Sequence, residues 1–63
     1  MKIQLHNRVK ELEIDSIKAR VLLKELGISP GAALVIKNDV LVCEDEILTA
    51  EDSIRIIKTI SGG

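Results

Sequence analysis

Apolar and polar side chains alternate along the first part of the chain, as expected of strands with one buried face. Residues 2–6 and residues 9–14 each follow this alternation, and Asn7 and Arg8 form a polar break between them. Two alternating runs with a short polar break are typical of a hairpin. We therefore predict two N-terminal strands that pair with each other.

The period of the pattern changes after these strands, because apolar residues now recur three and four positions apart. Asp15 and Ser16 are residue types that favour the N-cap of a helix. Gly27 is suited to the C-terminal cap, and Pro30 prevents the helix from resuming. We predict one helix between these signals. Its apolar face is formed by Ala19, Leu22, Leu23 and Leu26.

The second half of the chain predicts three more strands, at residues 34–37, 40–42 and 54–60. Asn38 and Asp39 separate the first two, and both residue types tolerate the positive φ of a tight hairpin turn. An acidic loop at 43–46 and a polar turn at 49–52 precede the last strand.

The predicted order is strand, strand, helix, strand, short strand, strand. It indicates an α+β fold: a mixed sheet of four to five strands with one helix across one face. The first and last strands would lie side by side and parallel in the middle of the sheet, which is the β-grasp arrangement of ubiquitin. We expect one domain at residues 1–60, followed by a flexible Ser-Gly-Gly tail at 61–63.

Composition narrows the function classes. Hydrophobic residues make up 46% of the chain and the net charge is only -1, which excludes a disordered protein. Because nine Lys and Arg are offset by ten Asp and Glu, nucleic acid is not an expected partner. No apolar run approaches the ~20 residues that cross a membrane. A single cysteine, Cys43, is typical of a reducing compartment, so we expect a cytoplasmic protein. We also expect the chain to be a monomer by itself.

Three segments stand out beside the predicted fold: "ALVIKNDVLV", "ILTAEDSIRII" and the terminal "ISGG". With these segments the chain resembles the small ubiquitin-like sulfur carriers of the ThiS/MoaD type, which serve thiamine and molybdopterin synthesis. Asn38 and Asp52 stand on the family's Asn and Asp, whereas Asp39 and Glu51 stand where glycine is usual. The similarity covers the whole chain in length and element order.

The resemblance implies a reaction at the last residue. An activating enzyme of the ubiquitin-activating type would adenylate the carboxylate of Gly63 with ATP, and a sulfur donor would convert the adenylate to a thiocarboxylate. Ser61 and Gly62 would be threaded into this adenylyltransferase, because glycine can pass close to other backbone. The chain would bind no cofactor and would not be an enzyme. Further partners would be a sulfurtransferase or the large subunit of a synthase.

Alternatives remain open at the level of the sequence. The same activated terminus could attach the chain to lysines as a modifier, and the tail could instead belong to a passive β-grasp binding module. The recipient of the sulfur is not encoded in a recognisable motif. His6 has no second ligand at metal-binding spacing, so no metal site is expected. Cys43 lacks a neighbour that would activate its thiol.

Strand alternation also predicts a partner surface on the face of the sheet away from the helix. The residues expected to face the helix are Ile3, Leu5, Leu12, Ile14, Leu34, Ile36, Ile54 and Ile56. Of the residues expected to face outward, we assign Val9, Val35, Ile57 and Thr59 to the partner surface. Ile57 runs directly into the tail, so a partner held there could reach Gly63.

Overall fold

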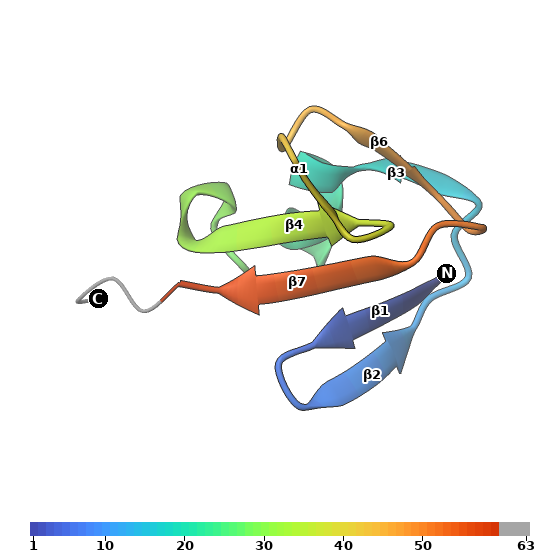
Figure 1. Cartoon of the computed structure of the whole chain (residues 1–63), viewed down its shortest axis with the longest axis horizontal. Helices are drawn as coiled ribbons and strands as arrows, with labels where there is room; N and C mark the ends of the chain where they lie inside the picture. Colours follow the sequence, from blue (N-terminus) through green and yellow to red (C-terminus); the bar gives the residue numbers. More distant parts are fainter. Residues whose placement is uncertain (60–63) are drawn as a thin grey trace.

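The structure of the chain is a computed structural model that describes residues 1–59, apart from the side chain of Pro30. It is an α+β fold with a mixed five-stranded sheet in the order β2-β1-β7-β4-β5, together with a two-stranded sheet formed by β3 and β6 (Figure 1). The elements are β1 (Lys2–Leu5), β2 (Arg8–Glu11), β3 (Ser16–Lys18), α1 (Ala19–Glu25), η1 (Pro30–Ala32), β4 (Ala33–Lys37), β5 (Val40–Val42), β6 (Ile47–Thr49) and β7 (Ile54–Lys58).

The first and last strands lie side by side in the middle of the main sheet, as the sequence predicts. β1 and β7 are parallel, with Ile3 opposite Ile54 and Leu5 opposite Ile56. The other strand pairs of this sheet, β1–β2, β4–β5 and β4–β7, are antiparallel. β7 therefore pairs with β4 over its whole length, Ile54–Lys58, and with β1 over its first part, Ile54–Ile56.

The hairpin turn between β4 and β5 is confirmed at Asn38 and Asp39. Their φ angles are 51° and 68°, the pair of positive values that a tight two-residue hairpin turn requires. The turn between β1 and β2 lies at His6 and Asn7, one residue earlier than the polar break predicted from the sequence. His6 takes a positive φ of 28° there.

The helix ends as predicted, but it begins later. Gly27 has a φ of +75° and donates its N–H to the Lys24 carbonyl, while the Ile28 N–H bonds the Leu23 carbonyl. These two bonds form a Schellman cap, for which glycine is favoured because it has no Cβ. The N-cap is Lys18, with no side-chain cap bond, so the predicted cap at Asp15 or Ser16 is wrong.

The late start of the helix has its cause in a strand that the sequence pattern did not reveal. Ser16 to Lys18 form β3 and pair antiparallel with β6, with Ile17 opposite Leu48. Leu48 is fully buried and Ile17 packs against the core. Long-range pairing and burial of these two residues outweigh the local capping preference of Ser16. β6 (Ile47–Thr49) follows the predicted loop at 43–46 and overlaps the predicted turn at 49–52 at Thr49.

The core lies between the main sheet and α1, and the predicted helical face is confirmed. Ala19, Leu22 and Leu23 are buried, and Leu26 packs against them just after the helix. The sheet contributes Ile3, Val35, Ile54 and Ile56, and Met1 and Leu48 complete the cluster. Of the helices formed by residues 1–59, none is long and apolar enough to cross a membrane.

One predicted orientation is wrong. Val35 was expected to face outward with Leu34 and Ile36 inward, but Val35 is only 3% exposed and Leu34 is 43% exposed. Register explains the reversal, because Val35 pairs with the buried Ile56 and Leu34 pairs with the exposed Ile57. Residues 33–36 are all apolar, so their own pattern does not show which of them face the core. Register with the partner strand decides this instead.

Candidate functional site

The residues predicted to carry the chemistry, Ser61, Gly62 and Gly63, lie outside the described residues. The structure does show how the chain approaches them. β7 is a central strand, and the Thr59 N–H bonds the Ala32 carbonyl at 2.9 Å just after it ends. The last described residue is thus fixed to the rigid part of the fold.

An apolar patch lies on the face of the sheet opposite the helix. We call Leu34, Ile36, Leu41 and Ile57 the outer-face patch. Leu34 is opposite Ile57 and Ile36 is opposite Leu41, so cross-strand neighbours bring all four together on β7, β4 and β5. Leu41 is 61% exposed and Ile57 is 41% exposed. Single exposed apolar residues are ordinary, but a contiguous apolar patch marks a candidate interaction site.

Only part of the predicted partner surface coincides with this patch. Ile57 belongs to it, whereas Val35 is buried beneath the sheet. Val9 is exposed on β2, but Gln4 and Arg55 stand between it and the patch in the cross-strand row. Thr59 is exposed beyond the end of β7. The roles of Val9, Ile57 and Thr59 toward a partner remain predictions.

Leu34, Ile36 and Leu41 are the patch members that the sequence pattern missed. Leu34 and Ile36 were assigned to the core because residues 33–36 are all apolar. Leu41 lies in the run Val40-Leu41-Val42, which is equally uniform. The only signal that could have placed them is the register of β4 with β7 and β5, which the sequence does not supply.

At the other end of the sheet, Asp52 joins the β4–β5 turn to the β6–β7 turn. Its carboxylate accepts the Thr49 N–H at 2.8 Å, the Thr49 hydroxyl at 3.0 Å and the Asn38 Nδ2 at 3.0 Å. Asn38 in turn accepts the Ser53 N–H on Oδ1 at 2.9 Å. Asn38 and Asp52 are the two residues that stand on the family's Asn and Asp, and here they hold two turns together.

Lys37 completes this cluster from the end of β4. Its Nζ donates to Glu46 Oε2 at 3.1 Å and to the Ile47 carbonyl at 3.1 Å, and lies 3.7 Å from Asp52 Oδ2. The bond to Glu46, aided by the charge of Asp52, raises the pKa of Lys37. The Thr49 N–H, followed by the Asn38 amide, lowers the pKa of Asp52. The cluster stabilises charges that are already present at neutral pH, so it offers neither a free base nor a free acid.

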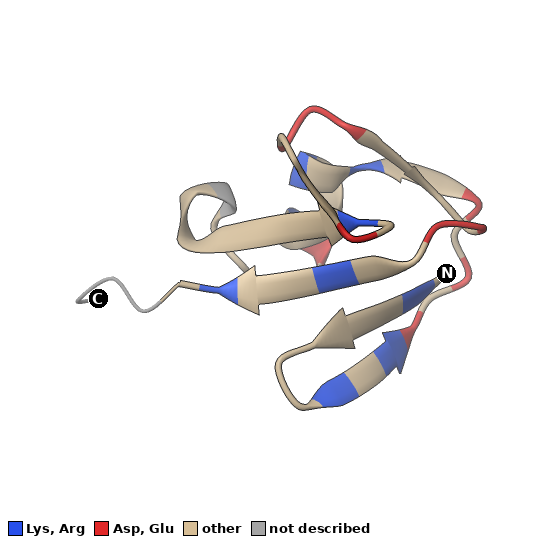
Figure 2. Cartoon of the chain, viewed as in Figure 1, with Lys and Arg blue, Asp and Glu red and all other residues tan. Residues whose placement is uncertain are grey.

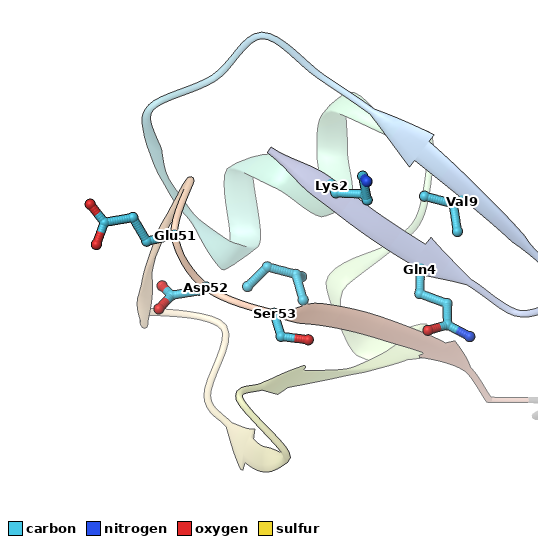
Figure 3. Close-up of a pocket in the computed structure, with 7 residues that line it drawn as sticks. Lys2, Gln4, Val9, Glu51, Asp52 and Ser53 are labelled. Atoms are coloured by element: carbon cyan, nitrogen blue, oxygen red, sulfur yellow. The ribbon is translucent and has the colours of Figure 1, made fainter.

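A hollow of about 310 Å³ lies beside this cluster, between the start of β1 and the turn before β7 (Figure 3). Lys2, Gln4, Val9 and residues 51–54 line it. The Glu51 carboxylate points away from Lys2 and Gln4 in Figure 3, and Asp52 is engaged in the cluster described above. Within residues 1–59 the Ser53 hydroxyl of this hollow forms no hydrogen bond to a carboxylate, so the hollow holds no activated nucleophile.

The remaining reactive residues stand apart from one another. Cys43 is an exposed free thiol after β5, and His6 is exposed in the β1–β2 turn. Within residues 1–59, no three His, Cys, Asp or Glu side chains gather closely enough to hold a metal ion.

Comparison with known proteins identifies no relative. No protein-family model matches the chain, and no curated protein matches it. Function is therefore inferred from the fold and its residues.

Proposed function

We propose that the chain is a ubiquitin-like sulfur carrier on a β-grasp fold, and that its Gly63 carboxylate is adenylated by a partner enzyme and converted to a thiocarboxylate. The proposal assigns the chain no catalytic residue, cofactor or metal of its own. ATP and the sulfur donor belong to the partner reaction, which would supply sulfur for cofactor synthesis or tRNA thiolation.

The observation that carries the proposal is the position of β7. A mixed sheet with parallel β1 and β7 at its centre, a helix on one face and a Gly-Gly pair after the central strand is the combination that characterises these carriers. β7 pairs with β4 on one side and with β1 on the other, so the strand that precedes the Gly-Gly pair is held in the middle of the sheet (Figure 1).

The chemistry requires activation by an enzyme. A carboxylate resists attack because oxide would have to leave, so a Gly63 oxygen first attacks the α-phosphorus of ATP and pyrophosphate departs. A sulfide-equivalent donor then attacks the acyl carbon and AMP leaves. The product is the thiocarboxylate. Glycine at 62 and 63 suits this sequence because a residue without a Cβ can lie close to the enzyme's backbone and to the nucleotide.

The outer-face patch supplies the surface for the activating enzyme in this proposal. It contains Ile57, on the strand that leads to the tail, and Leu34 opposite it. Apolar residues at the centre of an interface carry most of its binding energy. A partner that covers the patch would have the chain end within reach. Leu34, Ile36 and Leu41 therefore replace Val35 in the predicted partner surface.

The test is ATP–pyrophosphate exchange catalysed by the activating enzyme of the same host. Deleting Gly63 should abolish exchange while the fold persists, because the buried core that the structure describes is formed by residues between Met1 and Ile56. Ile57→Asp should raise the concentration of carrier needed for half-maximal exchange at least about tenfold, because the carboxylate would be buried against the partner.

Val40→Asp is the matched control. Val40 is 60% exposed, but it pairs with Lys37, whose other neighbour is the buried Ile54, so it lies on the opposite side of the sheet from Ile57. It should leave exchange unchanged. Equal exchange by the Ile57 and Val40 variants would remove the patch from the proposal, and exchange by a chain without Gly63 would refute the proposal itself.

A further inference from the structure

A second surface lies on the helix side of the sheet, between the edge strand β2 and the C-terminal end of α1. Two adjoining hollows, each of about 330 Å³, occupy this position and share Leu5, Arg8 and Leu26 in their lining. One extends along β2 to Val9 and Lys10, and the other extends past Gly27 and Ile28 to Lys58. We call the two together the β2–α1 groove.

The floor of the groove is aliphatic. Leu5, Leu26 and Ile28 are half-buried, and each packs against the core on one side while facing the hollow on the other. Such partly covered aliphatic residues leave apolar surface that a bound side chain could bury. The Schellman cap at Gly27 sets the position of Ile28, because it turns the chain back onto the end of the helix, and pairing with β2 and β7 sets the position of Leu5.

The rim of the groove is cationic. Arg8, Lys10 and Lys58 line it together with His6, and among residues 1–59 no Asp or Glu lines either hollow. Figure 2 shows Lys and Arg along β2 and at the end of β7, whereas Asp and Glu lie mostly in loops, apart from Glu11 at the end of β2 and Glu25 at the end of α1. Within the described part of the chain, Arg8, Lys10 and Lys58 form no ion pair, unlike Arg20 and Lys37.

One wall of the groove is an open strand edge. β2 is the outermost strand of the five-stranded sheet that residues 1–59 form, and all four of its residues are exposed. Such an edge presents backbone N–H and C=O groups that can pair with a strand from another chain. Cations on the edge oppose pairing between two copies of this chain, because Arg8 and Lys10 of each would meet. They favour a partner that brings negative charge.

We infer that the β2–α1 groove binds an extended acidic peptide segment of a partner protein, which pairs with the edge of β2 and places aliphatic side chains on Leu5, Leu26 and Ile28. Each part of the segment has a counterpart in the groove: the backbone at the strand edge, the aliphatic residues at the floor and the flanking carboxylates at the cationic rim. A nucleic acid fits less well, because the chain has no aromatic residue on which a base could stack.

This surface is distinct from the one assigned to the activating enzyme. The outer-face patch lies on the other side of the sheet, and the described residues that line the groove fall between Leu5 and Lys58. A partner could therefore be bound at β2 while the chain end is being activated. The inference does not depend on the sulfur chemistry, so the two can fail independently.

The probe is a synthetic peptide of about ten residues, with four aliphatic residues flanked on both sides by aspartate and glutamate. Titrated into the isotope-labelled full chain, it should shift the amide signals of residues 5–10, 26–28 and 58. Raising the salt concentration should weaken binding, because exposed charge pairs are screened. A peptide with the same aliphatic centre and lysine flanks should not bind, and N-methylation of alternate peptide amides should abolish binding by blocking strand pairing.

Variants locate the site. Arg8→Glu with Lys58→Glu should weaken binding of the acidic peptide at least about tenfold. Lys18→Glu makes the same kind of charge change at the other end of the helix and should leave affinity unchanged. Thermal melts of both variants check that they remain folded before their affinities are compared. The experiments with salt and with the lysine-flanked and N-methylated peptides use the unaltered chain, so they decide the question even if a variant unfolds.

Several results would overturn the inference. Equal binding of the acidic and lysine-flanked peptides would show that charge complementarity does not contribute to binding. Amide shifts confined to the outer-face patch would place the peptide site on that patch instead. Tighter binding of single-stranded DNA than of the peptide at the same residues would assign the groove to nucleic acid. Concentration-dependent shifts at β2 without peptide would assign it to a second copy. Tighter peptide binding by a chain ending at Thr59 would assign it to the chain's own last residues.

Discussion

The helix-to-sheet core makes a definite prediction for Leu22→Ala. Leu22 is fully buried on α1 and belongs to the same cluster as Ile3 and Ile56. Truncating a buried leucine to alanine costs about 2–5 kcal/mol, because apolar contacts are lost and a cavity remains. A chain of 63 residues with ~0.05–0.15 kcal/mol per residue has a free energy of unfolding of roughly 3–9 kcal/mol. The variant should therefore lose a large share of its stability.

Urea denaturation of the full chain measures the effect. With a slope near ~1 kcal/mol per molar urea for so small a domain, the midpoint should fall by about 2 M or more, or the variant should be unfolded in buffer. Leu26→Ala should cost less, because Leu26 is only half-buried after the helix end. Val21→Ala is the control, since Val21 is exposed on the same helix and should change stability by less than about 0.5 kcal/mol. Equal midpoints for Leu22→Ala and Val21→Ala would refute the assigned helical face.

Three further predictions follow from other parts of the fold. Val35→Asp should unfold the domain while Ile57→Asp leaves its circular dichroism spectrum and melt unchanged; the opposite result would restore the orientation that the sequence pattern suggested. The thermal midpoint should be flat from about pH 5 to pH 9 and fall on both sides. Asp52, with its pKa below the usual 3.8, stabilises the fold above that value and loses this effect as the pH falls through its folded pKa. Lys37, with its pKa above the usual 10.5, stabilises the fold below that value and loses this effect as the pH rises through its folded pKa. If the thermal midpoint of an Asp52→Asn variant fell at acid pH in the same way as that of the parent chain, Asp52 would not be the group responsible for the fall. Gly27→Ala should cost about 1 kcal/mol in a urea melt, from the positive φ alone because no atom lies where its Cβ would go; a stability gain would contradict this.

Local signals in the sequence predicted the features that depend on one or two residues. Asn38 and Asp39 indicated a tight turn because few residue types accept positive φ, and the structure has the turn there. Gly27 indicated the helix end for the same reason. The helical face followed from spacing, and the parallel pairing of the first and last strands followed from the order of the elements.

Features set by distant parts of the chain could not be predicted in this way. Ser16 has the local character of a helix cap, but its pairing with β6 across the fold decides its conformation. Val35 lies in an apolar run, and only the register with Ile56 determines that it faces the core. The β2–α1 groove likewise depends on how the helix end is seated against β1 and β2, which no short stretch of sequence specifies.

The central proposal is that Gly63 accepts sulfur, and intact-mass measurement tests it most directly. The chain is incubated with ATP, a sulfide-equivalent donor and the activating enzyme of its host, and a chain lacking Gly63 is treated in parallel. The account predicts that the parent chain gains the mass difference between one sulfur and one oxygen, only when ATP and donor are both present, and that fragmentation places the gain on the last residue. The chain without Gly63 should gain nothing. An unchanged parent mass in the presence of an activating enzyme that adenylates it, or conjugation to lysines in place of the sulfur gain, would contradict the proposal.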